Sequence, residues 1–292
     1  MSSHATPDRT KYFVPEPSWY PFALTAGLVA VIIGVWGYLE DKHVGLVPVL
    51  AGVAVAISII WMWMYRVSHE SEGGFYGPQV DRTFRWGMSW FIFSEVAFFG
   101  AFFGALYYAR QLSLPWLAGE GAEQSTNALL WPGFENVWPS NGPGAIGGDF
   151  ETIPEWGIPF LNTVLLITSS FTVTWAHHAL KEGKRQACIA WMIVTVLLGA
   201  TFLYYQVGEY AEAYSELNLT LGSGIYGSTF FMLTGFHGMH VTLGTLMLII
   251  ITGRLISGHF KPDYHFGFEG VAWYWHFVDV VWIGLFTFVY VL

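Results

Sequence analysis

Long apolar stretches separated by short polar connections dominate this sequence. Seven of them reach the length of about 20 residues that an α-helix needs to cross a bilayer. Several are bracketed by Trp or Tyr, as is typical of the aromatic belts at membrane surfaces. The predicted spans are residues 19–39, 44–65, 84–108, 158–179, 188–207, 225–252 and 271–292. The pattern therefore predicts an all-α membrane protein, with one seven-helix domain at residues 19–292 after a polar tail at residues 1–18.

The distribution of Lys and Arg predicts how the helices are oriented. If the N-terminus is cytoplasmic, ten of the twelve basic residues fall in inner segments, and only Lys42 and Arg110 fall outside. An excess of Lys and Arg marks the cytoplasmic side of membrane proteins. We therefore expect a cytoplasmic N-terminus and, after seven spans, a C-terminus on the opposite side.

Composition narrows the range of functions. Charged residues make up only 11% of the chain and the net charge is −9, which argues against binding to nucleic acid. The single cysteine, Cys188, excludes an internal disulfide and any Cys-x-x-Cys metal or redox pair. No Walker loop, GxGxxG, GxSxG or HExxH motif occurs, so nothing predicts nucleotide or hydrolytic chemistry.

The longest connection, residues 111–157, is external in this topology and is acidic. Connections of this length are usually functional or disordered. Its Gly and Pro residues, together with two Trp-Pro pairs, predict an irregular loop anchored by aromatic side chains. We favour a solvated acidic loop over the alternative, a docking surface for a basic partner.

One carboxylate, Glu95, lies inside the third apolar stretch. In a helix it is roughly 15 Å along the axis from Arg85, the nearest preceding charge, and therefore near the middle of a bilayer. An ionisable side chain at that depth costs about 2.5–3.5 kcal/mol on insertion scales, so a functional role is the first hypothesis. The alternative is a neutral glutamic acid that joins two helices.

Small residues follow Glu95 at helical spacing and form a stripe that includes Gly-xxx-Gly. The stripe consists of Ala97, Gly100, Ala101, Gly104 and Ala105. Such a face predicts close contact with another helix. Glu95 points almost the opposite way, among bulky side chains, namely Phe91, Phe98, Phe99, Phe102 and Leu106.

Candidate partners for Glu95 lie in the last two spans. His237 and His240 share one helix face, and so do His276 and Asp279, because each pair is three residues apart. Hydrogen bonding lowers the cost of burying such groups. We favour a hydrogen-bonded polar or proton-linked network over a metal site, although imidazole and carboxylate suit iron, copper or zinc. The spacing does not match a bis-histidine haem site.

A second cluster is predicted at the cytoplasmic surface, where His177 and His178 end the fourth span and His265 and Glu269 precede the seventh. Solvated residues at the membrane surface are the favoured interpretation. A proton-collecting or adventitious zinc-binding patch is the alternative.

Several motifs resemble those of cytochrome c oxidase subunit III in the haem–copper oxidase family. They are Ser94–Phe99, Leu161–Thr163, Thr174–His178, Tyr226–Phe231, Thr234–Val241 and His265–Trp282. They extend over most of the chain from Arg82 onwards. The resemblance implies a two-helix and a five-helix bundle with a V-shaped, lipid-filled cleft between them.

The resemblance also implies the partners and site residues. A chain of this family carries no cofactor and no metal; haem and copper belong to partner subunits, with catalytic subunit I in direct contact and subunit II in the same complex. Glu95 corresponds to a buried, carbodiimide-reactive glutamate. Phospholipid is expected at Arg254, Glu70 and Trp63 and along the phenylalanine face, namely Phe91, Phe98, Phe99 and Phe102.

The expected function follows from the resemblance. The chain is expected to be subunit III of a terminal oxidase in a bacterial inner membrane. That oxidase passes electrons from cytochrome c to dioxygen and pumps protons. Its subunit III sustains proton uptake and protects the catalytic subunit from inactivation during turnover. The N-terminus would then be cytoplasmic and the C-terminus periplasmic. A quinol oxidase subunit and an independent proton-coupled transporter are the alternatives.

Overall fold

Seven long apolar helices make up most of the chain in a computed structural model that describes residues 12–40, 45–121 and 124–292. Each helix is long and apolar enough to cross a membrane. They comprise α1 Tyr20–Leu39, α2 Leu46–Glu72, α3 Pro78–Tyr108, α6 Ile158–Lys181, α7 Arg185–Ser215, α8 Gly224–Ile256 and α9 Phe266–Leu285. The predicted all-α, seven-helix membrane fold is therefore confirmed. Residues 1–11 of the predicted tail, and Lys42, lie outside the described residues.

Shorter helical pieces extend two of the spans. After α3 the chain continues as a π-helix, Ala109–Ser113, and a short helix α4, Leu114–Leu117. A second π-helix, Phe286–Val291, follows α9. The helix α5, Gln124–Leu130, lies in the long connection.

The chain divides into two compact units, the first ending at Phe84 and the second beginning at Arg85. In the first unit, α1 and α2 pack on each other through glycines. A Cβ atom added to Gly27 would lie 3.1 Å from the carbonyl oxygen of Gly52, and one added to Gly34 would lie 2.6 Å from the backbone nitrogen of Val49. The absence of side chains at these positions therefore lets the two backbones approach closely.

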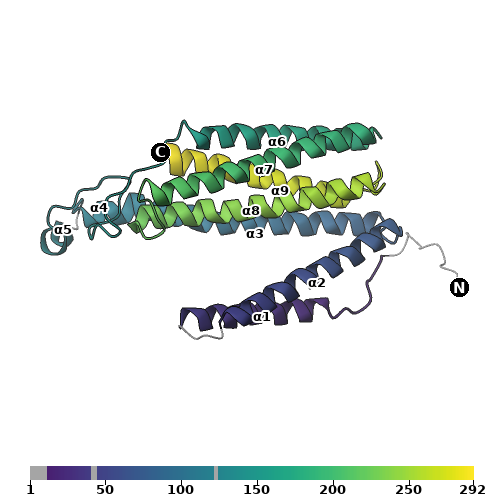
Figure 1. The fold of residues 1–292 in the computed structure, drawn as a ribbon, viewed down its shortest axis with the longest axis horizontal. Coiled ribbons are helices and arrows are strands. Elements are labelled where there is room, and N and C mark those ends of the chain that lie inside the picture. The colour runs from purple at the N-terminus through teal and green to yellow at the C-terminus, as the bar shows by residue number, and fades with distance from the viewer. Residues whose placement is uncertain (1–11, 41–44, 122–123) are drawn as a thin grey trace. The chain divides into compact units, whose positions relative to one another are not determined.

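In the second unit, four helices close a ring. Helix α6 packs on α7 and α9, and α8 packs on the same two helices, with the axes nearly parallel (Figure 1). Trp275 of α9 is fully buried where these helices meet. A Cβ atom added to Gly199 or Gly244 would lie 2.7 or 2.8 Å from its indole ring. Its Nε1–H donates to Ser169 Oγ at 2.8 Å, so the tryptophan connects α9 to α6, α7 and α8 and also satisfies its own polar atom.

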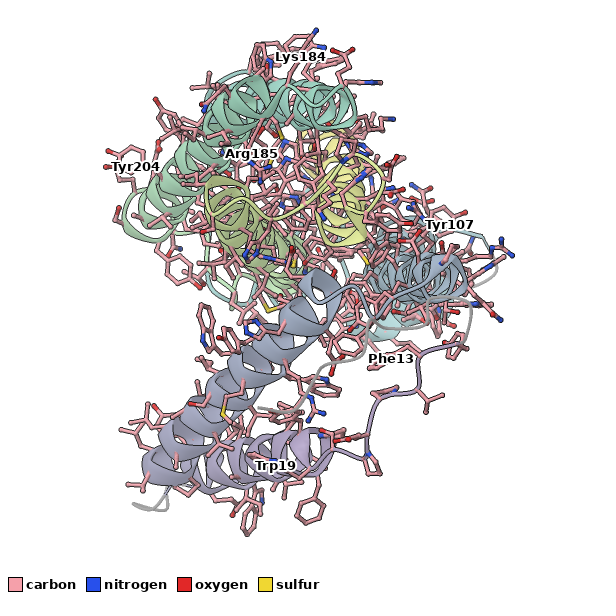
Figure 2. All side chains as sticks on the ribbon, turned by 90° about the vertical axis from the view of Figure 1, so that its right-hand side faces the viewer. Phe13, Trp19, Tyr107, Lys184, Arg185 and Tyr204 are labelled. Atoms are coloured by element: carbon pink, nitrogen blue, oxygen red, sulfur yellow. The ribbon has the colours of Figure 1, made fainter. Side chains whose placement is uncertain are left out.

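The outside of the second unit is apolar. In the view along the bundle, Tyr204 projects from the outer side of α7, while Lys184 lies at the end where α6 and α7 connect (Figure 2). Tyr204 is 75% exposed. Large exposed apolar side chains on transmembrane helices are expected to face lipid or partner helices, because the bilayer core contains no water to disfavour them.

Most of the helices are longer than the apolar stretches that predicted them. Helix α2 continues to Glu72, α3 begins at Pro78, and α7 runs from Arg185 to Ser215. Hydrophobicity indicates only the part of a helix that matches the hydrocarbon core, whereas backbone hydrogen bonding continues beyond it.

The small-residue stripe on α3 differs from expectation. A Cβ atom added to Gly100 or Gly104 would meet nothing within 4 Å. The prediction of close contact with another helix is therefore wrong within the second unit. Small residues permit close packing but do not require it, and the contacts of the opposite face decide how α3 is turned.

Candidate functional site

Glu95 of α3 is hydrogen-bonded to His240 of α8. The distance from Glu95 Oε2 to His240 Nε2 is 3.0 Å. The Glu95 side chain is 21% exposed and that of His240 is 8% exposed. The structure thus joins two of the residues that the sequence predicts for a buried polar network, and it supplies the partner that lowers the cost of burying the acid.

The second ring nitrogen of His240 determines how this bond is made. His240 Nδ1 lies 2.7 Å from the carbonyl oxygen of Phe236, which can only accept a hydrogen bond, so Nδ1 carries a hydrogen. With a neutral ring, Nε2 has a lone pair and a protonated Glu95 is the donor, so that the two residues share one proton. This arrangement avoids placing two charges in a low-dielectric region.

Aromatic rings enclose the pair. Phe98 and Phe99 lie with their ring centroids 6.1 and 5.1 Å from that of His240. Phe98 and Phe102 also pack on Phe236, at 5.0 and 5.2 Å. These side chains therefore have protein partners on the face where the sequence predicts lipid, and Phe99 is only 2% exposed.

The other predicted members of the network lie apart from Glu95. His237 Nε2–H donates to the carbonyl oxygen of Val278 at 3.2 Å. His276 does not pair with Asp279 as its spacing suggests. It contacts α6 instead, with Nδ1 2.6 Å from Ser170 Oγ. The buried Asp279 carboxyl lies beside Ser170 without hydrogen-bonding geometry.

The alternative metal site at mid-depth is not assembled. Within the described parts of the chain, only one group of three His, Cys, Asp or Glu side chains has ligand atoms close enough to hold a metal. That group is His177, His265 and Glu269 at the ends of α6 and α9. Its side chains are partly buried, whereas the neighbouring His178 is exposed.

A second buried acid, Glu209 of α7, was not predicted from the sequence. It is 1% exposed, and its Oε1 accepts a hydrogen bond of 2.5 Å from the Tyr290 hydroxyl. The predicted fifth span ended at residue 207, so Glu209 fell in a polar connection. Its helical spacing from buried Phe202 and Gln206 was the signal that would have placed it on the inner face.

The three residues expected at lipid headgroups have protein contacts. Arg254 Nε donates to His259 Nδ1 at 3.3 Å, and its guanidinium lies 4.4 Å from the centroid of the Phe260 ring. In the first unit, Trp63 stacks on Tyr20 with centroids 6.1 Å apart.

Glu70 accepts hydrogen bonds from Arg66 Nε at 3.1 Å and from the Tyr76 hydroxyl at 2.8 Å. Burial raises the pKa of Tyr76, and the hydrogen bond to the Glu70 carboxylate raises it further. The phenol therefore stays a donor to Glu70.

Comparison with known proteins identifies the family. Residues 10–120 and 131–292 match the family described as cytochrome c oxidase subunit III. The chain is 39% identical over 280 residues to cytochrome c oxidase subunit 3 of Marchantia polymorpha, covering 96% of this chain and 95% of the relative. The corresponding proteins of Danio rerio and Arabidopsis thaliana are each 37% identical, and both matches cover 96% of the relative.

The chain belongs to the cytochrome c oxidase subunit III family. It is therefore the third subunit of a terminal oxidase and acts in aerobic respiration as part of a multi-subunit membrane complex. Glu95 and His240 both lie in the part of the chain that matches the subunit III family.

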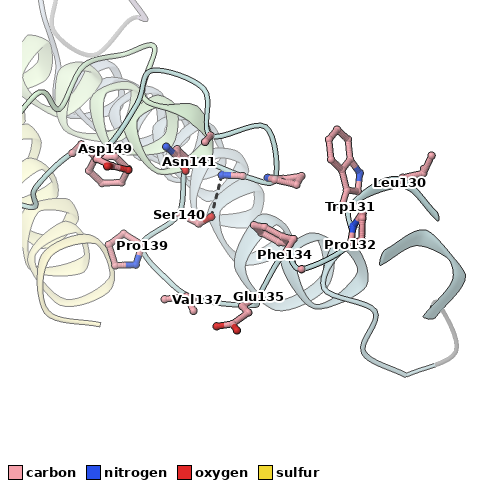
Figure 3. A pocket seen from close by; sticks show the side chains of 15 residues that line it. Leu130, Trp131, Pro132, Phe134, Glu135, Val137, Pro139, Ser140, Asn141 and Asp149 are labelled. Atoms are coloured by element: carbon pink, nitrogen blue, oxygen red, sulfur yellow. Dashed lines mark hydrogen bonds between the residues drawn. The ribbon is translucent and has the colours of Figure 1, made fainter. Parts of the chain in front are cut away.

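The long connection of this subunit III forms a pocket of about 740 Å³, lined by Trp131, Phe134, Glu135 and Asp149 among others (Figure 3). Asn218 Nδ2 donates to the carbonyl oxygen of Asp149 at 2.8 Å and ties the loop to the segment after α7. The ring centroid of Trp138 lies 5.5 Å from that of Tyr226 in α8. The expected aromatic anchoring is thus present, and the family match breaks only inside this connection, between residues 120 and 131.

Proposed function

We propose that this chain is a non-redox subunit that binds phospholipid, sustains proton uptake by the catalytic subunit and protects that subunit from inactivation during turnover. Haem and copper then belong to partner subunits, and cytochrome c is the electron donor of the complex. The relatives with assigned names are cytochrome c oxidase subunits, which favours this donor over quinol.

The observation that carries the proposal is the hydrogen bond between Glu95 and His240. Phenylalanine rings enclose the pair. Among the described residues, no third His, Cys, Asp or Glu side chain lies close enough to complete a metal site with Glu95 and His240. A single hydrogen-bonded proton in such a site suits the tuning of an adjacent proton-transfer route more than it suits redox chemistry of its own.

The exposed stripe on α3 supports contact with the catalytic subunit. Gly100 and Gly104 present an open small-residue face that no described residue approaches. Close approach of another transmembrane helix is the use for which such a face is best suited. We place the N-terminus in the cytoplasm and the C-terminus in the periplasm of a bacterial inner membrane, because basic residues concentrate at the inner ends of the helices.

Phospholipid binding is proposed at Arg254, near the end of α8. The half-buried guanidinium lies in the last turn of the apolar helix α8, which is the depth at which a phosphate group meets a transmembrane helix. Glu70, Trp63 and the exposed Phe91 are proposed to line lipid as well. His177, His178, His265 and Glu269 are proposed to collect protons at the cytoplasmic surface.

The test is Glu95→Ala in the purified oxidase complex. We expect unchanged haem and copper content and a shorter lifetime of activity during continuous turnover, because the shared proton is lost while the cofactor sites are untouched. The exposed Glu135→Ala in the external connection is the matched control. Loss of haem from the Glu95→Ala complex would contradict the non-redox role, and an unchanged turnover lifetime would contradict the tuning role.

Co-purification separates this proposal from an independent transporter. A subunit stays with a haem-bearing membrane protein through purification, and its complex shows a visible haem spectrum. Proton-coupled transport by the chain alone, reconstituted into vesicles without such a partner, would favour the transporter.

A further inference from the structure

Two histidines and a glutamate converge where α6 ends and α9 begins. His177 Nε2 and His265 Nε2 are 3.0 Å apart. One ligand atom from each histidine and one from Glu269 all lie within 4.8 Å of one another. His265 is the residue before the first turn of α9 and Glu269 lies in that turn, so the helix start fixes both relative to each other.

The hydrogen bonds of His265 prepare its Nε2 as a ligand. His265 Nδ1 lies 3.1 Å from the carbonyl oxygen of Lys261, which can only accept, so Nδ1 carries the hydrogen and Nε2 has a lone pair. Metal-binding histidines commonly donate their second N–H to a carbonyl in this way. The hydrogen between the two Nε2 atoms must then come from His177.

A metal ion can take the place of that hydrogen. The lone pairs of both Nε2 atoms are directed at the same small volume once His177 loses its Nε2 proton. In a tetrahedral zinc site with bonds of about 2.0–2.2 Å, neighbouring ligand atoms are about 3.3 Å apart. The two nitrogens are already near that separation, and a Glu269 carboxylate oxygen lies within 4.8 Å of a ring nitrogen of each histidine.

We propose that His177, His265 and Glu269 form a binding site for a divalent transition-metal ion of the zinc class. Two imidazoles and one carboxylate suit Zn²⁺ or Cd²⁺ better than Mg²⁺ or Ca²⁺, which prefer oxygen ligands alone. Three protein ligands leave the fourth position for water. The site uses three of the four residues proposed to collect protons, and metal binding there depends neither on that role nor on the role proposed for Glu95.

Arg85 competes with the metal. Its guanidinium forms an ion pair with Glu269, whose side chain is 13% exposed. Metal binding draws the Glu269 carboxylate towards the histidines and weakens this pair. Arg85→Gln removes both the competing partner and a nearby positive charge, so it should increase the affinity for Zn²⁺ several-fold.

The experiment measures Zn²⁺ bound to the purified oxidase complex, without an affinity tag of histidines, by equilibrium dialysis and elemental analysis. We expect His265→Ala to lose one bound equivalent, Glu269→Gln to weaken that site at least tenfold, and Arg85→Gln to strengthen it. His178→Ala, an exposed neighbour outside the cluster, is the matched control and should keep the wild-type number. Equal Zn²⁺ binding by wild type, His265→Ala and Glu269→Gln would overturn the proposal.

A measurement on the unaltered complex removes dependence on the variants. Crystals soaked in Cd²⁺ should show an anomalous scattering peak bonded to both Nε2 atoms. Absence of a peak between His177 and His265 at saturating Cd²⁺ would overturn the site, even if His265→Ala fails to assemble.

Discussion

Replacing Glu95 by Gln and by Ala should have different consequences, because Gln can still donate a hydrogen bond to His240 and Ala cannot. In the neutral pair, Glu95 donates to His240 Nε2 over 3.0 Å. The amide of Gln is nearly the same size and also donates, so Glu95→Gln keeps the bond. Ala removes it and leaves Nε2 without a partner.

The magnitudes follow from the environment of the pair. Side-chain hydrogen bonds within membrane proteins are worth about 0.6 kcal/mol on average and up to about 1.7 kcal/mol. With His240 only 8% exposed, water replaces the lost partner poorly, so Glu95→Ala should cost about 1–2 kcal/mol. Glu95→Gln should cost less than about 0.5 kcal/mol, because the donor is retained.

The assay is a titration of the purified complex with a denaturing detergent, followed by the fraction of this chain that stays folded and bound. The midpoints should rank wild type and Glu95→Gln together, with Glu95→Ala lower. His240→Leu is expected to match Glu95→Ala, and the double variant should cost less than the sum of the two, because both remove the same bond.

An ionised pair predicts the opposite result for Gln. Removing one charge from a buried ion pair leaves the other charge buried without a partner and costs about 3–5 kcal/mol. A Glu95→Gln complex at least as unstable as Glu95→Ala would therefore refute the neutral pair. Infrared spectroscopy gives an independent check, since Glu95→Gln should remove the carbonyl stretch of one protonated carboxyl group.

Two further predictions concern residues on α7, α8 and the C-terminal π-helix. Tyr290→Phe removes the hydroxyl that donates to Glu209, a side chain only 1% exposed, and should destabilise the complex by about 1–3 kcal/mol. The measurement is the thermal midpoint of the complex, which should fall. Tyr204→Phe, at an exposed position, is the control and should leave the midpoint unchanged. Arg254→Gln should lower the number of phospholipids that co-purify, counted by mass spectrometry. The exposed Lys184→Gln is its matched control, and equal lipid content in both variants would contradict a headgroup site at Arg254.

Much of the fold was predictable because the bilayer imposes a length and a polarity on each span. Seven apolar stretches of sufficient length specify seven helices, since no other open structure satisfies its backbone groups in lipid. The isolated carboxylate of Glu95 was equally predictable, because a charge within an apolar run is expensive and therefore stands out. The helix ends were less predictable, since hydrogen bonding continues beyond the hydrocarbon core.

Packing decided what the sequence left open. The Gly-xxx-Gly stripe at Gly100 and Gly104 predicted a helix contact, yet α3 turns the opposite face to α8, because the aromatic rings and the bond to His240 lie there. Spacing alone also suggested that His276 pairs with Asp279 on its own helix, whereas the ring contacts Ser170 of α6.

The sequence by itself determined how many helices cross the membrane and which unusual polar residues they carry, because both depend on local composition. Only the tertiary structure decided which of these residues meet. Glu95 contacts His240, Glu209 contacts Tyr290, and His177 contacts His265, across separations of 145, 81 and 88 residues. Such pairings depend on how each helix is rotated about its axis, and that rotation is set by the packing of all side chains together.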